Sequence, residues 1–234
     1  MYGPAPLTQL ALDLPPPPPT FGNFVPGENA EALGAVRALL APGTDAGTRF
    51  LYLWGPAGSG RTHLLRALAE ASEAARRPSR MLSPSSRAED FVFDPAVRTW
   101  LIDECDRLAA AEQVAAFHLF NAVQAEPGAV LASAGSEPPA RLAVIPELSS
   151  RLGWGLVMQL RPLSDADTAR AIEQTLSERG LAAGADLVPW LLTRAPRDLG
   201  SLRGLIDALD RFALQRQRAI TLPLLREFLQ QRLL

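Results

Sequence analysis

The stretch LYLWGPAGSGRTHLL, residues 51–65, decides the fold of this chain. It has the spacing G-x-x-x-x-G-K-[ST] of a phosphate-binding loop, except that Arg61 stands where the pattern has lysine. Glycines in such a loop let consecutive N–H groups point at phosphate oxygens, and the helix that follows directs its positive end to the same place. An apolar strand pattern precedes the loop and a helical pattern follows it, as this reading requires. The stretch therefore predicts a nucleotide site; the alternative is a glycine-rich turn without a ligand.

Arg61 raises the question of whether the predicted site hydrolyses a nucleotide or only binds it. All 23 basic residues of the chain are arginine, so Arg61 partly reflects a composition without lysine. A planar guanidinium fork nevertheless cannot replace a compact ammonium atom for atom. We expect Arg61 to contact the terminal phosphates, to preserve phosphate affinity and to compromise hydrolysis. The predicted loop residues are Gly55, Pro56, Ala57, Gly58, Ser59, Gly60, Arg61, Thr62 and His63, with Thr62 as a ligand of Mg²⁺.

An acidic partner for the loop follows a second apolar pattern, RTWLIDE, residues 98–104. The carboxyl ends of parallel strands meet at one edge of a sheet, beside the phosphate loop. We therefore expect Asp103 to hold Mg²⁺ and Glu104 to orient an attacking water. The alternative is a solvated turn between a strand and a helix. Glu104 is not expected in a site that has no hydrolytic role.

The composition indicates a globular protein that works through protein partners. Of 234 residues, 47% are hydrophobic, and the formal net charge of −2 provides no basic surface for autonomous binding to duplex DNA. One cysteine, no long apolar run and no basic leader predict a cytoplasmic protein without a membrane segment. His63, His118 and Cys105 lack ligand spacing, so we expect no dedicated protein metal site. The four tryptophans are expected in the core or at a domain seam: Trp54, Trp100, Trp154 and Trp190.

The chain divides into three parts by pattern. Residues 1–20 form a tail that carries a polyproline spacer, Pro15 to Pro19. Residues 21–162 alternate predicted strands and helices, which is typical of an α/β domain with a parallel sheet. Residues 163–234 contain only helical patterns and predict a small all-helical lid.

Five motifs together resemble a known family. TFGNFVPGEN, GPAGSGRTHLL, LIDE, SSRLGWGL and APRDL occur in this order and look like the AAA+ core of the DnaA/Hda family of replication proteins. The resemblance covers about residues 20–234. We expect two features of DnaA initiators to be missing: a short segment stands in place of the helical insertion that contacts single-stranded DNA, and no helix-turn-helix domain is expected after the lid. The chain is thus similar to the short members of the family, which promote hydrolysis of DnaA-bound ATP while docked on the sliding clamp.

The resemblance implies three further site residues. Arg151 of SSRLGWGL corresponds to the arginine finger, which stabilises charge on the phosphoryl group in a neighbouring subunit. Arg197 of APRDL matches the lid arginine called sensor 2. Ser136 of GSEPP matches the first sensor, with Ser133 as the fallback. A surface salt bridge remains the alternative for Arg151, and a helix-end cation is the alternative for either arginine.

The tail contains a second implied binding element. QLALDL, residues 9–14, looks like the clamp-binding peptides of this family, although Asp13 departs from the proline or serine expected there. Gln9 would offer its amide to a pocket rim, and Leu10, Leu12 and Leu14 would supply apolar anchors. Tethering of this kind raises the local concentration of the domain without DNA contacts of its own.

These features predict a negative regulator of replication initiation that acts in the regulatory inactivation of DnaA. It would bind ADP or ATP with Mg²⁺, with the nucleotide ordering the lid and positioning Arg151. Its expected partners are DnaA and the beta-subunit sliding clamp of DNA polymerase III, and a homo-oligomer is possible. One alternative is an autonomous AAA+ ATPase, such as a helicase loader or a transposition-type helper. Another is a binding module that brings DnaA to the clamp without affecting hydrolysis.

Overall fold

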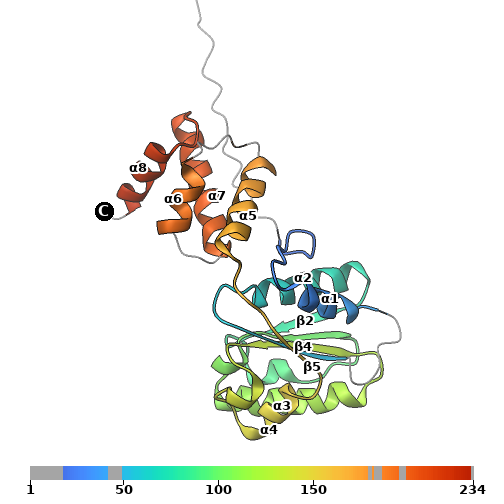
Figure 1. The fold of residues 1–234 in the computed structure, drawn as a ribbon. Helices are drawn as coiled ribbons and strands as arrows, with labels where there is room; N and C mark the ends of the chain where they lie inside the picture. Colours follow the sequence, from blue (N-terminus) through green and yellow to red (C-terminus); the bar gives the residue numbers. More distant parts are fainter. Residues whose placement is uncertain (1–17, 42–48, 179–180, 182–185, 195–198, 233–234) are drawn as a thin grey trace, which may run out of the picture. The chain divides into compact units, whose positions relative to one another are not determined.

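The computed structural model describes residues 18–41, 49–178, 181, 186–194 and 199–232. These residues form two compact units, which divide after Ser164 (Figure 1). The first unit is an α/β structure, and the second contains only helices.

A five-stranded parallel sheet forms the centre of the first unit. The strands are β1 (Phe50–Trp54), β2 (Ser79–Leu82), β3 (Thr99–Ile102), β4 (Val130–Gly135) and β5 (Leu156–Gln159), in the order β2-β3-β4-β1-β5. All four strand pairs are parallel. The central strands are continuous apolar runs because helices cover both faces of the sheet. The parallel α/β sheet expected from the sequence is confirmed.

Two helical layers enclose this sheet, as Figure 1 shows. One face packs against α1 (Ala30–Ala38) and α2 (Arg61–Ala74), and the other against α3 (Ala110–Ala125) and α4 (Pro146–Leu152). Three short 3₁₀ turns lie in the connections: η1 (Ala88–Phe91), η2 (Cys105–Arg107) and η3 (Pro139–Arg141). The turns that follow β1, β3 and β4 leave the sheet at its carboxyl edge, since the strands are parallel. This edge therefore collects the predicted nucleotide-site residues.

The tryptophans have different environments. Trp100 is fully buried, and Trp54 packs against the core beneath α3 and α4, as expected. Trp154 was expected in the core or at a domain seam, but its side chain is 42% exposed. It lies just before β5, an edge strand whose Leu156 and Val157 are also exposed. Of the two positions expected for Trp154, the structure excludes the core.

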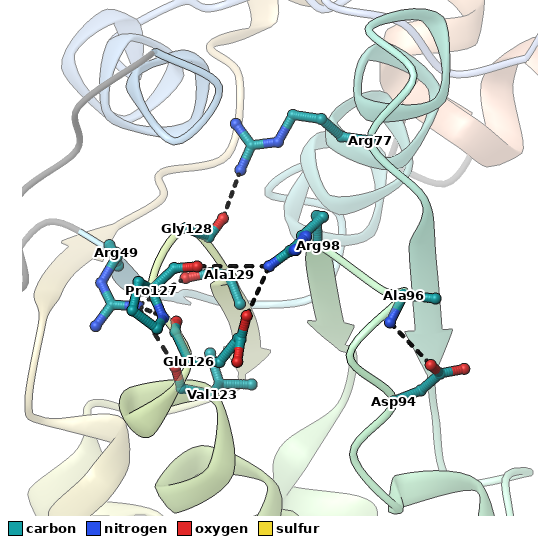
Figure 2. Close-up of polar contacts among 10 residues, drawn as sticks. All are labelled: Arg49, Arg77, Asp94, Ala96, Arg98, Val123, Glu126, Pro127, Gly128 and Ala129. Atoms are coloured by element: carbon teal, nitrogen blue, oxygen red, sulfur yellow. Dashed lines mark hydrogen bonds and ion pairs between the residues drawn. The ribbon is translucent and has the colours of Figure 1, made fainter.

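At the amino edge of the sheet, arginine side chains form hydrogen bonds with the segment between α3 and β4 (Figure 2). Arg49 is only 8% exposed and donates hydrogen bonds to the carbonyl oxygens of Val123, Gln124, Glu126 and Ala129 at and beyond the end of α3. The last carbonyls of a helix have no partner within the helix and carry its negative end, so a guanidinium satisfies both their hydrogen bonding and their charge. Arg49 thus ties the end of α3 to the start of β1.

The second unit contains α5 (Asp165–Glu178), α6 (Leu187–Arg194), α7 (Leu199–Arg216) and α8 (Leu222–Arg232). These helices share an apolar core of their own, which includes Ile172, Leu191, Ile206 and Leu224. The all-helical character expected for the lid is confirmed. Across the described part of the chain, no helix has the length and apolarity needed to cross a membrane.

Candidate functional site

The loop after β1 is tightly packed around its glycines. Gly58 and Gly60 have φ values of 79° and 97°, in the left-handed region that favours glycine. A Cβ at Gly60 would lie 2.8 Å from the ring of Phe24, and a Cβ at Gly55 would lie 2.2 Å from the carbonyl oxygen of Leu160. The glycine pattern is therefore required by both backbone conformation and close approach, and α2 begins directly after it at Arg61.

The loop also contains a buried polar atom that could bind a ligand. The hydroxyl of Ser59 is buried and has no hydrogen-bond partner among the described residues. Buried polar groups are nearly always hydrogen-bonded, so an orphaned hydroxyl in a phosphate-binding loop calls for an external acceptor or donor. This observation and the positive end of α2 fit the oxygens of a nucleotide phosphate.

The acidic strand end and the loop are brought together as the sequence predicts. Thr62 donates its hydroxyl hydrogen bond to a carboxylate oxygen of Asp103 at 2.7 Å, although the two residues are 41 positions apart. Asp103 is only 7% exposed, and its other oxygen accepts the backbone N–H of Glu104 at 3.0 Å. A hydroxyl and a carboxylate in contact at the start of α2 are oxygen ligands suited to Mg²⁺.

Glu104 lies beside this pair but faces a different partner. Its backbone is left-handed, with φ 49° and ψ 50°. Its carboxylate accepts a hydrogen bond from the guanidinium of Arg107 at 2.8 Å. This hydrogen bond and the negative charge of Glu104 raise the pKa of Arg107. Glu104 is thus at the predicted edge but is engaged in an ion pair within its own turn.

The two candidate serines for the first sensor have different positions. Ser136 follows β4 at the carboxyl edge, where its backbone N–H and its hydroxyl both donate to Asp106, at 3.1 and 2.8 Å. Ser133 lies within β4, is 1% exposed, and donates to the carbonyl oxygen of Leu51. Ser136 is therefore the serine on the side of the phosphate loop. Its single hydroxyl proton, however, is used by Asp106.

Arg61 is the first residue of α2 and directly follows the glycines of the phosphate loop. Burial raises the pKa of Tyr52, and the positive charge of Arg61 opposes that rise. Tyr52 therefore remains protonated at neutral pH, and its hydroxyl donates to the carbonyl oxygen of Glu137 at 2.8 Å.

His63 holds the polypeptide segment before α1 against the loop. Its Nε2 lies 3.0 Å from the carbonyl oxygen of Thr20, and its ring packs at a tilt on Phe24. Phe24 is the same residue that contacts Gly60. The structure therefore gives His63 a positioning role in the wall of the loop.

The side chain of Arg151 lies away from the phosphate loop and is held by Asn121 and two aromatic rings. Its Nε donates to the side-chain oxygen of Asn121 at 2.8 Å, and its guanidinium lies 4.1 Å from the ring centre of Trp154 and 5.2 Å from that of Phe117. Stacking between two aromatic rings fixes the plane of the guanidinium. Its contacts among the described residues leave the terminal N–H groups available for another acceptor.

The position of Arg151 excludes an action on the chain's own phosphate loop. Arg151 lies at the end of α4, before β5, and the neighbouring Trp154 packs against Phe50, the first residue of β1. The phosphate loop follows the last residue of β1, and a five-residue strand spans roughly 13 Å. The two sites therefore lie at opposite edges of the sheet.

Several predicted residues lie outside the described part of the chain. Arg197, the expected sensor 2, belongs to the residues between α6 and α7 that the structure does not describe. The same is true of the four expected clamp-binding residues, Gln9, Leu10, Leu12 and Leu14. Their roles remain predictions.

Sequence reasoning missed the side chains that hold the site residues. Asp106 and Arg107 lie two and three residues after Glu104, but their contacts depend on the shape of a 3₁₀ turn, which has no spacing signature. Phe117 and Asn121 are more accessible to prediction, because residues four apart lie on one face of a helix. Their target, Arg151, is nevertheless 30 residues away from Asn121 and can be found only from the fold.

Two family models match the chain, one in each unit. Residues 17–95 match the bacterial DnaA ATPase domain, and residues 165–229 match the lid domain of Hda. The first match contains the phosphate loop, and the second covers most of the helical unit.

Solved structures share the fold. Domain III of the replication initiation protein DnaA from Thermotoga maritima has a TM-score of 0.74 at 21% identity, with 91% of this chain and 95% of that chain covered. AMPPCP-bound DnaA from Aquifex aeolicus has a TM-score of 0.68 at 22% identity, with 82% and 65% covered. The RuvB Holliday junction branch migration motor of Thermotoga maritima has a TM-score of 0.66 at 18% identity, with 91% and 72% covered.

The fold, the phosphate-loop motif and the acidic strand end define an AAA+ protein with a helical lid. Within that class, a DnaA-type core and an Hda-type lid occur in one chain. The chain is an Hda/DnaA-like AAA+ protein and a DnaA-related replication regulator.

Proposed function

We propose that this protein is a negative regulator of chromosomal replication initiation. It binds a nucleotide, docks on the DNA polymerase sliding clamp through residues 9–14, and promotes hydrolysis of DnaA-bound ATP by supplying Arg151 in trans. The observation that carries this proposal is the placement of Arg151 at the sheet edge opposite the phosphate loop, stacked between Trp154 and Phe117. An arginine in that position serves a nucleotide bound to another subunit.

The chain's own site would hold ADP or ATP with Mg²⁺. The Ser59 hydroxyl and the loop N–H groups would meet phosphate oxygens, and Thr62 and Asp103 would hold the metal. The metal would neutralise phosphate charge there. Arg61 adds a second positive charge at the start of α2 and supports retention of the nucleotide.

Replacement of Asp103 by asparagine tests the metal-bound nucleotide site. Asparagine keeps one side-chain oxygen to accept the Glu104 N–H, and its NH₂ group can donate to the hydroxyl of Thr62 in place of the bond that this hydroxyl donates to Asp103, so the turn should persist. We expect nucleotide affinity in Mg²⁺ to fall about tenfold or more, because the carboxylate charge that would hold the metal is lost. Isothermal titration with ADP measures this. The difference between the two proteins should disappear in EDTA, and equal affinities in Mg²⁺ would refute the assignment.

Removal of residues 1–14 tests the proposed tether. We expect affinity for the clamp to fall at least about tenfold, because the amide of Gln9 and three leucine anchors are lost together. Surface plasmon resonance on immobilised clamp measures this. Leu12→Ala combined with Leu14→Ala is the matched point variant, and both proteins should bind nucleotide as the intact chain does. Unchanged clamp binding by both variants would exclude the tail as the docking element.

The presence of Glu104 favours a second candidate, an AAA+ ATPase in its own right, such as a helicase loader or a transposition-type helper. An acidic residue directly after the metal-binding aspartate is the position from which a water is oriented. Steady turnover by the purified protein, lost in Glu104→Gln, would support this candidate. Turnover equal to that of Glu104→Gln would eliminate it.

A further inference from the structure

A residue of the turn η2 forms an ion pair with Glu104, the residue that would orient water for hydrolysis. The carboxylate of Glu104 accepts a hydrogen bond from Arg107, three residues later, at 2.8 Å. Arg107 is 66% exposed at its side chain, and its interactions with Glu104 are the main cause of its raised pKa. One of the two carboxylate oxygens of Glu104, Oε1, is thus already bound to a cation.

The backbone of Glu104 supports the view that this arrangement is specific. Three residues other than glycine have positive φ among the described residues: Arg76, Glu104 and Gln217. Arg76 and Gln217 lie just beyond the ends of α2 and α7, where this conformation is usual. Glu104 instead lies between β3 and η2, where a left-handed residue costs conformational energy and commonly marks a functional turn.

Another residue of η2, Asp106, forms hydrogen bonds with Ser136, the polar residue that follows β4. Asp106 accepts both the N–H and the hydroxyl of Ser136. A serine has one hydroxyl proton, and here that proton goes to Asp106. Neighbouring residues of η2 therefore hold the two side chains, Glu104 and Ser136, that would complete hydrolysis. Meanwhile Thr62, Asp103 and the phosphate loop remain arranged for binding.

We propose that Arg107 is a positioning residue that suppresses this chain's own ATP hydrolysis by holding Glu104 in the ion pair. This inference rests on the proposed nucleotide site and deepens it. In hydrolysis, the oxygen of water bonds to the γ-phosphorus, the bond from that phosphorus to the β-γ bridging oxygen breaks, and Glu104 takes the proton of the water. ADP and inorganic phosphate are the products. The ion pair with Arg107 must open before the Oε1 atom of Glu104 can take part in that proton transfer.

The expected effect is modest because the ion pair is exposed. Side-chain exposures of 66% for Arg107 and 39% for Glu104 mean that water and salt compete with the pair. An exposed pair of this kind shifts an equilibrium by only a few fold. We therefore expect Arg107→Ala to raise the rate constant of ATP hydrolysis about two- to fivefold.

Single-turnover hydrolysis of radiolabelled ATP tests the proposal with the full chain in excess over nucleotide. Arg107→Ala should be faster than the natural chain, and Arg107→Lys, which keeps the charge, should remain close to it. Arg107→Ala combined with Glu104→Gln should lose the acceleration. Arg98→Ala is the matched control, because it removes an arginine–glutamate pair of 2.9 Å at the opposite sheet edge and should not change the rate.

Salt provides a readout that a purely structural role would not change. The ratio of the Arg107→Ala rate to the natural rate should fall towards one as ionic strength rises from about 0.05 to 0.5 M, because salt screens the pair. ATP binding is measured first by equilibrium dialysis. Normal binding with no acceleration in Arg107→Ala overturns the role of Arg107 and leaves the nucleotide site intact. Absence of binding by the natural chain overturns both.

Discussion

Replacement of Arg151 by alanine is expected to abolish the stimulation of DnaA-bound ATP hydrolysis, with a loss of about 10³-fold or more, the usual contribution of an arginine finger. The variant removes a guanidinium whose plane is fixed by Trp154 and Phe117 and whose Nε is bonded to Asn121. The measurement is release of labelled phosphate from ATP-bound DnaA in the presence of DNA-loaded clamp.

Two further variants show whether the loss belongs to the guanidinium. Arg151→Lys keeps the charge but not the planar fork, so it should recover little of the activity. Arg141→Ala removes an exposed arginine that pairs with Glu137, and it should stimulate normally. Full stimulation by Arg151→Ala would instead mean that this protein only brings DnaA to the clamp.

The largest expected effect on stability comes from Arg49→Leu. Leucine fills much of the buried space but removes the Arg49 donor from four carbonyl oxygens at and beyond the end of α3, three of which Figure 2 shows. Those of Val123 and Glu126 keep a backbone N–H donor, and those of Gln124 and Ala129 lose the guanidinium. Each buried group that loses its partner is costly, so we expect the free energy of unfolding to fall by about 3 kcal/mol. For a chain of this size the melting temperature should drop by roughly 6–12 °C. Differential scanning calorimetry measures the shift.

Arg98→Leu is the matched control for Arg49→Leu. Arg98 reaches the same turn, where it pairs with Glu126 at 2.9 Å and bonds to the carbonyl of Pro127. Its side chain is 40% exposed, so water can replace the lost contacts, and we expect a loss of no more than about 1 kcal/mol. Equal losses in the two variants would show that burial at Arg49 does not set its contribution.

The sequence predicted the sheet, the lid and the meeting of Thr62 with Asp103 because each depends on a periodic pattern or a motif of fixed spacing. The loop needs its glycines where backbone and neighbours leave no space for a Cβ, and the apolar runs at 50–54 and 99–102 become buried central strands. Parallel topology then places the carboxyl ends of β1 and β3 side by side.

The interactions that set the state of the site were not predictable in the same way. The pairing of Glu104 with Arg107 and that of Ser136 with Asp106 depend on side-chain directions within a short 3₁₀ turn. Trp154 was expected in the core or at a domain seam, but it is exposed and its ring lies against the guanidinium of Arg151. Its aromatic face serves an arginine, and this role has no periodic pattern in the sequence.

Arg61 and η2 together give a reason why an AAA+ protein with Thr62, Asp103 and Glu104 in place would retain a nucleotide without hydrolysing it. Arg61 preserves positive charge at the start of α2, while Arg107 holds Glu104 in an ion pair. On this account the nucleotide maintains the structure of the regulator, and the hydrolysed ATP belongs to DnaA.

The most direct test of the central claim follows labelled ATP prebound to DnaA after this protein and DNA-loaded clamp are added together. The account predicts conversion of DnaA-bound ATP to ADP that requires both additions and fails when the protein lacks residues 1–14 or carries Arg151→Ala. If the DnaA-bound label remains ATP while the protein hydrolyses free ATP, the account is contradicted and an autonomous ATPase takes its place.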